Sequence, residues 1–175
     1  MRFMATPIAG LYRVFGNVHR DERGSFERTW CREVFAAAGL NFSPWQTSLS
    51  CNDQSLTLRG LHYQAAPAAE CKLVRCVAGR VFDVVVDLRQ GSPTLLQYWA
   101  TTLCAGEGNA LFIPHGCAHG FLTLTDGAVV EYMMDSPHAP EHARGLRWDD
   151  PALNVWWPAE PKVISERDRT WPDHG

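Results

Sequence analysis

Short valine-rich runs separated by turn residues are the feature that most limits how this chain folds. Residues 71–89 contain two such runs joined at 78–80, and within the second the side chains of 82–87, FDVVVD, alternate as in a sheet with one polar and one apolar face. Four more short runs follow, each bounded by a turn-like segment: 95–103, 109–114, 119–125 and 128–134. Strands at a spacing of about ten residues predict an antiparallel sandwich or barrel.

The remaining segments add little regular structure. Residues 26–40 have helical character, with Gly39 placed to end the helix. Beyond residue 136, six prolines prevent long regular elements, so we expect the tail to wrap over the sheet. With 175 residues, of which 46% are hydrophobic, the chain has enough apolar surface for one core but not for two, which predicts a single domain over 1–175.

Composition and charge exclude several classes of partner. The net charge of −3 leaves no basic surface for nucleic acid. No apolar run is long enough to span a membrane and no basic leader precedes one, so we expect a cytoplasmic protein with no membrane partner. The six cysteines contain no C-x-x-C pair, which favours free thiols in a reducing compartment.

The stretch LRGLHYQ, residues 58–64, places a cation and an imidazole in an otherwise apolar strand. In a regular strand Arg59 and His62 point to opposite faces, so they share a face only if the strand kinks or bulges at Gly60. The alternative is a core histidine beside a surface arginine.

Three further stretches carry unusual polar residues. Lys72 directly precedes an apolar strand, His115 and His119 share a glycine-rich turn, and residues 164–168 read ISERD. A barrel mouth that gathers such groups would bind an anionic small molecule, with Arg59, Lys72 and His119 suited to phosphate oxygens or to a developing enolate.

Five motifs together resemble the dTDP-4-dehydrorhamnose 3,5-epimerase family in order and spacing. They are DERGSF (21–26), LRGLHYQ (58–64), KLVRCVAGRVFDVVVDLRQGSPT (72–94), IPHGCAHGF (113–121) and WDDPALNVWWP (148–158). The resemblance implies an all-β, antiparallel jelly-roll barrel (cupin-like, a double-stranded β-helix) with one or two short helices. It also implies a homodimer, a nucleotide diphosphate sugar substrate and no metal or cofactor. The absence of an H-x-H pair agrees with the lack of a cupin metal.

The reaction implied by the resemblance explains the polar residues. In a nucleotide-linked 4-keto-6-deoxy sugar, loss of the proton at C3 or C5 gives an enolate, and reprotonation on the other face inverts that carbon. Such chemistry requires a base on one side and an acid on the other. The resemblance assigns the base to His62, its carboxylate partner to Asp168 and the proton donor to Tyr132, with Lys72 stabilising the enolate oxygen or binding diphosphate.

The resemblance also assigns a set of substrate-binding residues. They are Arg23, Phe26, Gln46, Ser48, Arg59, Lys72, His119, His138 and Arg167, with Arg28, Asp83 and Glu141 as further candidates. Asp83 would serve as a second partner inside the barrel or form a structural ion pair with a strand neighbour.

The chain departs from the family pattern at the nucleotide-binding end. Arg28 replaces a glutamate, Ser48 an asparagine, His138 the tyrosine that stacks on thymine and Ala143 a glutamate, with Glu141 two places away. None of these changes falls on the proton-transfer residues. We therefore expect the epimerase chemistry to be retained and the nucleotide to be recognised differently, through a base other than thymine.

Other interpretations stay open at this point. An enzyme that inverts only C3 or only C5, on a nucleotide other than dTDP, would use the same residues, and a non-catalytic sugar-nucleotide binder would keep the barrel. A metal-dependent cupin oxygenase or isomerase would need clustered ligands, which His62, His115 and His119 would have to supply. The family pattern has no histidine at 115, so we expect His115 to be structural or solvent-facing.

Overall fold

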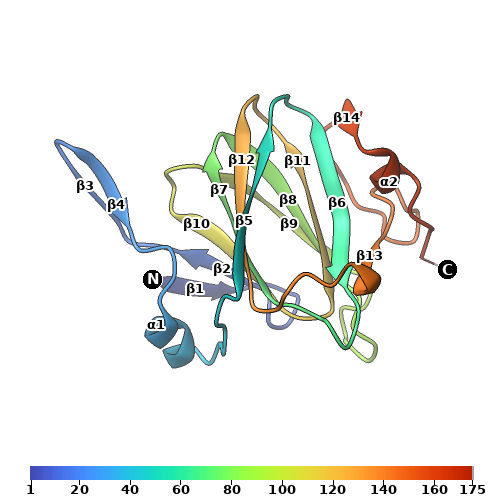
Figure 1. Cartoon of the computed structure of the whole chain (residues 1–175), viewed down its shortest axis with the longest axis horizontal. Helices are drawn as coiled ribbons and strands as arrows, with labels where there is room; N and C mark the ends of the chain where they lie inside the picture. Colours follow the sequence, from blue (N-terminus) through green and yellow to red (C-terminus); the bar gives the residue numbers. More distant parts are fainter. Residues whose placement is uncertain (175) are drawn as a thin grey trace.

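A computed structural model describes residues 1–174, and most of its strands belong to two facing sheets of mainly antiparallel strands (Figure 1). The first, called the β7 sheet, has the order β1-β2-β10-β7-β12-β5. Its strands are β1 (Arg2–Ala5), β2 (Tyr12–Phe15), β10 (Asn109–Ile113), β7 (Lys72–Ala78), β12 (Ala128–Met134) and β5 (Gln46–Asn52).

The second sheet, called the β6 sheet, has the order β13-β6-β11-β8-β9, and β14 adds to β6 in parallel. Its strands are β13 (Ala143–Gly145), β6 (Thr57–Gln64), β11 (Cys117–Thr123), β8 (Arg80–Asp87), β9 (Tyr98–Cys104) and β14 (Val163–Ile164). Strands from distant parts of the chain are neighbours in both sheets, as in a jelly roll.

The main core fills the space between the two sheets. Val74 and Leu111 of the β7 sheet pack there with Val85 and Phe121 of the β6 sheet, and all four are fully buried. The alternation predicted for residues 82–87 is present: Val85 points into this core, whereas Val84 and Val86 point to the outer face, which is also buried. The expected all-β cupin-like barrel is confirmed.

The predicted helix over 26–40 is only partly correct. Helix α1 (Arg32–Ala37) stops before Gly39, which has a φ of +76° as expected for a helix terminator. The preceding residues instead form strand β4 (Gly24–Glu27), which pairs with β3 (Val18–Asp21) in a separate hairpin. Pairing between these strands overrides the local helical preference. Figure 1 shows the hairpin projecting from the barrel, on the side opposite α2.

The proline-rich tail wraps the outer face of the β6 sheet, as predicted. It contains the short 3-10 helix η1 (Pro140–His142), β13, β14 and helix α2 (Glu166–Arg169). Leu146 and Leu153 of the tail are buried against the sheet in one apolar cluster. The tail thereby brings α2 alongside β6.

The helices of this chain are short. Helix α1 has six residues and α2 has four. Within residues 1–174, no helix has the length and apolar character needed to cross a membrane. All six cysteines are free thiols.

Candidate active site

A bulge in β6 turns two polar side chains toward the barrel interior. His62 lies opposite His119, and Arg59 lies opposite Phe121, so β6 uses one more residue than β11 between these pairs. The extra residue coincides with Gly60, where φ is +138° and a Cβ would lie 2.5 Å from a backbone carbon of β11. Directly opposed residues share a face, so the bulge, the condition under which Arg59 and His62 were expected to share a face, puts both side chains on the inner face.

The inward-facing imidazole of His62 pairs with a buried carboxylate. Its Nε2 lies 2.6 Å from Oδ1 of Asp168, whose side chain is 6% exposed whereas that of His62 is 45% exposed. The Gly60 amide and the Trp171 indole each donate to this carboxylate at 3.3 Å. Burial alone would raise the pKa of Asp168, but the hydrogen bond and charge of His62, then the two N–H donors, lower it below its usual value.

This arrangement suits a general base. An ionised Asp168 accepts a hydrogen bond from Nε2–H of His62, which leaves the lone pair of the neutral ring on Nδ1. When the imidazole gains a second proton, the adjacent carboxylate stabilises the positive charge. The partial exposure of His62 gives a ligand access to the ring.

A second histidine–aspartate pair lies deeper in the barrel. Nε2 of His119 is 2.9 and 3.0 Å from the two oxygens of Asp83, and the side chains are 3% and 0% exposed. Burial raises the pKa of Asp83 despite the opposing effect of His119. The ring of His119 is enclosed in the single chain, so its contact with the charged part of a substrate stays a prediction. Asp83 pairs with His119 on the neighbouring strand, one of the two roles expected for it.

Tyr132 faces this pair from the other sheet. It lies on β12, its ring centroid is 5.7 Å from that of His119, and the rings meet edge to face. Burial, followed by the negative charge of Asp83, raises the pKa of Tyr132 well above its usual value, although Arg59 opposes this. The phenol therefore stays protonated at neutral pH and is available as a proton donor. His62 and Tyr132 thus come from opposite sheets.

Lys72 belongs to a buried polar network. It forms an ion pair with Glu70, which also accepts from the Gln64 amide at 3.1 Å. The same Gln64 amide donates to the Pro137 carbonyl at 3.2 Å and accepts from the Ala139 amide at 2.7 Å. Gln64 therefore holds Glu70, the partner of Lys72, and also the segment 137–139, which contains His138.

A cavity of about 190 Å³ opens between these groups. Five residues singled out by the sequence analysis line it: His62, Lys72, His138, Ala143 and Arg167. Lys72 and Arg167 give it cations suited to phosphate oxygens. Pockets for whole ligands usually have volumes of roughly 300 to 1,000 Å³, so this cavity accommodates only part of a nucleotide sugar.

Four other residues predicted to contact substrate, Gln46, Ser48, Arg59 and Glu141, do not line this cavity. The register aligns Gln46 with Met134 and Lys72, and Ser48 with Tyr132, so both β5 side chains face inward. Arg59 donates to Oδ1 of Asn52 at 2.7 Å. Glu141 is exposed in η1 and lies 3.8 Å from the ring of His142.

The hairpin residues are not brought to the cavity within one chain. Arg23, Phe26 and Arg28 lie on or beside the projecting β3–β4 hairpin, far from α2 in Figure 1. The Arg23 side chain is 83% exposed and pairs with Asp21, and Phe26 is 72% exposed. A single chain therefore lacks these predicted contacts.

Three residues at the site were missed by sequence reasoning. Gln64 and Glu70 hold Lys72, and Trp171 donates to Asp168. Two signals were available: Gln64 shares strand parity with His62, and Trp171 follows Asp168 by three residues, the spacing of one helical turn. Gly145 makes room for the indole, because a Cβ there would lie 2.2 Å from Trp171.

The three histidines proposed for a metal-dependent cupin do not share a site. His62, His115 and His119 each lie beside a different aspartate. Within residues 1–174, the group of clustered donors contains only His115 among them, together with Cys71 and Asp135. The histidine-based metal centre is therefore not supported.

Comparisons with known proteins agree with this fold. The family model described as dTDP-4-dehydrorhamnose 3,5-epimerase matches residues 5–174. A protein of that name from Sinorhizobium fredii is 42% identical over 98% of this chain and 89% of its own length.

Two solved structures also match nearly the whole chain. One is a dTDP-4-dehydrorhamnose 3,5-epimerase from Bacillus anthracis with TDP and PPi bound, with a TM-score of 0.95, 32% identity and 98% coverage of both chains. The other is a 3′-monoepimerase from Streptomyces bikiniensis in complex with dTDP-quinovose, with a TM-score of 0.90 and 32% identity, covering 96% of this chain and 85% of that one.

Proposed function

Because the chain belongs to the dTDP-4-dehydrorhamnose 3,5-epimerase family, we propose how its residues epimerise a nucleotide-linked 4-keto-6-deoxy sugar. The chain is an isomerase of deoxysugar biosynthesis, and its reaction inverts carbons next to the keto group through an enolate. The observation that carries the residue assignment is the 2.6 Å contact between the half-exposed His62 and the buried Asp168.

The first step is proton abstraction by His62. The imidazole takes the acidic proton from C3 or C5, the electron pair of the broken C–H bond moves into the enolate, and the charge develops on the C4 oxygen. Asp168 remains ionised beside the new imidazolium, because its pKa is lowered in this environment. Proton transfer by a positioned group of this kind contributes about 10²- to 10⁴-fold in rate.

The second step is proton delivery by Tyr132. Its phenol comes from the sheet facing His62, so a proton from Tyr132 reaches the opposite face of the enolate. The raised pKa of Tyr132 keeps the proton on the phenol until the enolate, a strong base, accepts it. Solvent then reprotonates the phenolate and accepts the proton held by His62, which completes the cycle.

Cations hold the rest of the substrate. Lys72 and Arg167 line the cavity, so we assign them to the enolate oxygen and the diphosphate. The Lys72–Glu70 ion pair keeps the ammonium in place before substrate arrives. Around the inner faces of the strands, Gln46, Ser48 and Arg59 extend the contact surface.

We further propose that the enzyme acts as a homodimer in which the β3–β4 hairpin of one subunit completes the pocket of the other. Two observations support this: the cavity in one chain is small for a nucleotide sugar, and Phe26 is 72% exposed on strand β4 of the projecting hairpin. Phenylalanine and arginine, the residue types that this hairpin presents, are enriched at protein–protein interfaces. Arg23 and Arg28 would then contact the nucleotide of the partner subunit's substrate.

Solvent exchange tests the residue assignment. The purified enzyme is incubated with dTDP-4-keto-6-deoxyglucose in D₂O, and deuterium at C3 and C5 is followed by NMR. We expect rapid incorporation with the wild type and a loss of about 10²- to 10⁴-fold with His62→Ala. His174→Ala, which changes a histidine outside the cavity lining, is the matched control. Unchanged exchange in His62→Ala would contradict the role of this residue as the base.

Inversion of C3 alone is a second candidate, because one of the similar structures is a 3′-monoepimerase. The same experiment separates the two possibilities, since a single-centre enzyme incorporates deuterium at C3 without forming the C5 epimer. A protein that only binds the nucleotide sugar would show no exchange at either carbon.

A further inference from the structure

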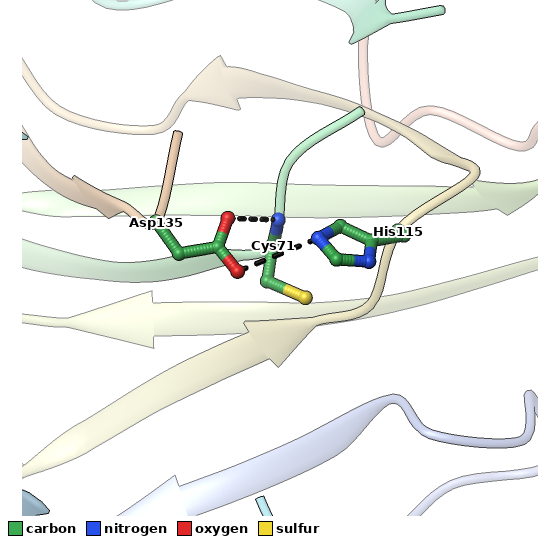
Figure 2. A group of neighbouring side chains, drawn as sticks. All are labelled: Cys71, His115 and Asp135. Carbon is green, nitrogen blue, oxygen red and sulfur yellow. Dashed lines mark hydrogen bonds and ion pairs between the residues drawn. The ribbon is translucent and has the colours of Figure 1, made fainter. Parts of the chain in front are cut away.

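Three potential metal ligands converge outside the catalytic cavity. Cys71 precedes β7, His115 lies in the turn between β10 and β11, and Asp135 follows the last residue of β12. Their sulfur, nitrogen and oxygen ligand atoms all lie within 4.8 Å of one another. Figure 2 shows the three side chains meeting from three separate segments.

The cluster and the cavity are on opposite faces of the β7 sheet. Cys71 packs in the apolar cluster with Leu73 and Phe112, on the outer face that α1 covers. The next residue, Lys72, lines the catalytic cavity. Because successive residues of an extended chain point to opposite faces, these three ligands do not belong to the epimerase site.

The spacing of the nitrogen and oxygen differs from that in the other histidine–aspartate pairs. Nε2 of His115 is 3.4 Å from Oδ2 of Asp135, against 2.6 Å for His62 with Asp168 and 2.9 Å for the His119 pair. Two ligands bound to one tetrahedral Zn²⁺ at its usual N and O bond lengths are separated by about 3.4 Å. The contact is thus long for a hydrogen bond between charged groups and suited to a shared ion.

The Asp135 carboxylate is already oriented for this role. Its Oδ1 accepts a hydrogen bond from the Cys71 backbone amide at 2.8 Å, which leaves Oδ2 directed toward His115. Metal-bound carboxylates are commonly held by such a second hydrogen bond. This hydrogen bond therefore positions Cys71 and Asp135 while leaving Sγ of Cys71 and Oδ2 of Asp135 available to bind an ion.

We propose that Cys71, His115 and Asp135 form a binding site for a divalent transition-metal ion of the zinc class, with water as the fourth ligand. Zn²⁺ accepts this mixture of sulfur, nitrogen and oxygen donors. His115 is 55% exposed and provides a route for the ion, whereas Asp135 is 15% exposed. Binding would join the ends of β7, β10 and β12, and would give a role to the histidine that the family pattern does not explain.

Coordination requires the Cys71 thiol to release its proton to solvent as the S–metal bond forms. Part of the binding free energy therefore offsets ionisation of the thiol, and with three protein ligands we expect weaker binding than at a four-ligand structural zinc site.

Cobalt titration of the full-length protein tests the site. The protein is stripped with chelator, dialysed and titrated with Co²⁺, and the thiolate-to-cobalt charge-transfer absorption is recorded. We expect one ion per chain with a thiolate band that Zn²⁺ displaces, and a higher melting temperature with Zn²⁺. His115→Ala should lower the affinity by roughly tenfold or more, and Cys71→Ser should abolish the band.

Cys51→Ser is the matched control, since it removes an exposed cysteine outside the cluster and should leave the titration unchanged. If Cys71→Ser fails to fold because the residue is buried, His115→Ala still tests the proposal through an exposed side chain. Absence of a thiolate band in the wild type, or equal affinity in His115→Ala, would overturn it. These readouts use no sugar substrate, so their failure leaves the epimerase proposal unaffected.

Discussion

The barrel contains two histidine–aspartate pairs built from the same groups but set in different surroundings. His62 is 45% exposed and its partner Asp168 has a lowered pKa, whereas His119 is 3% exposed and its partner Asp83 has a raised pKa. Burial raises the pKa of Asp83 more than His119 lowers it, whereas at Asp168 the effects of His62 and the N–H donors outweigh burial. Asp168 receives two N–H hydrogen bonds besides that of His62, while His119 is the only side chain that hydrogen-bonds Asp83 among residues 1–174.

Residue type therefore does not determine which pair exchanges protons with a substrate. The His62 pair has a carboxylate that stays ionised and a ring that a ligand reaches, so it is suited to cycling between protonation states. The His119 pair is enclosed, and each of its members provides the polar partner that the other needs in the barrel interior. Four experiments sharpen or break this contrast.

The largest expected effect is on stability, from removing the enclosed histidine. His119→Ala leaves Asp83 buried without its partner, and breaking a buried pair in this way costs about 3 to 5 kcal/mol. Urea unfolding followed by circular dichroism measures the loss. His62→Ala, which exposes the remaining carboxylate to a cavity, should cost much less. Equal losses in the two variants would remove the distinction between the pairs.

Tyr132→Phe should separate the two proton transfers. His62 still removes the proton, so deuterium exchange at the sugar continues, but delivery to the opposite face loses its donor. We expect the formation of inverted product to fall around a hundredfold with a smaller change in exchange rate. Product is measured by chromatography alongside the NMR exchange assay. Parallel losses in both assays would contradict the separate roles.

The two aspartates should affect pH stability with opposite sign. Asp168 has a lowered folded-state pKa, so its contribution is present above the unfolded-state pKa, which is about 3.9, and is lost as pH falls through the lower folded value. Asp83 has a raised pKa, so its contribution is present below the unfolded-state value and is lost as pH rises through the folded one.

Asparagine variants make this difference measurable. The difference in free energy of unfolding between wild type and Asp168→Asn should narrow as the pH falls. For Asp83→Asn, the free energy of unfolding should increase relative to that of the wild type as the pH rises. Denaturant unfolding across an acidic pH series provides the free energies of unfolding. Gaps that change in the same direction for both variants would show that the pKa shifts have the wrong sign.

The smallest effect concerns nucleotide recognition at the rim of the cavity. His138 lines the cavity where the family pattern has a tyrosine, so thermal-shift titrations with dTDP, GDP, CDP and UDP should favour a base other than thymine. His138→Tyr should raise affinity for dTDP by roughly two- to tenfold, the range of one aromatic contact. A clear preference of the wild type for dTDP at submillimolar affinity would refute altered base recognition.

Local pattern predicted the parts of the fold that depend on neighbouring residues. The alternation of 82–87 identified a strand, and parity in LRGLHYQ identified Gly60 as the position where a bulge would bring Arg59 and His62 to one face. The helix expected over 26–40 was too long, because the β3–β4 pairing is a contact that local preference does not contain.

The site depended more heavily on contacts between distant residues. Asp168 lies 106 positions from His62, and only the family resemblance connected them before the structure. The sequence does not show that His119 is enclosed, because the enclosure results from packing against Asp83 and Tyr132 on other strands. For that reason His119 was assigned to the ligand. Gln64 was missed because its partners lie in a loop 73 or more positions away and in the segment before β7.

The close approach of Gly60 to Gly120 also affects how the protein tolerates change. A Cβ at Gly60 would lie 2.5 Å from the Gly120 backbone, and one at Gly120 would lie 2.8 Å from the backbone of Arg59. Neither position has room for alanine even if the other remains glycine, so a library built across β6 and β11 should lose most variants here. Ala143 and Arg144, on the cavity rim, carry no such restriction. Altered sugar or nucleotide preference is therefore best selected at the rim, where variation leaves the placement of the base intact.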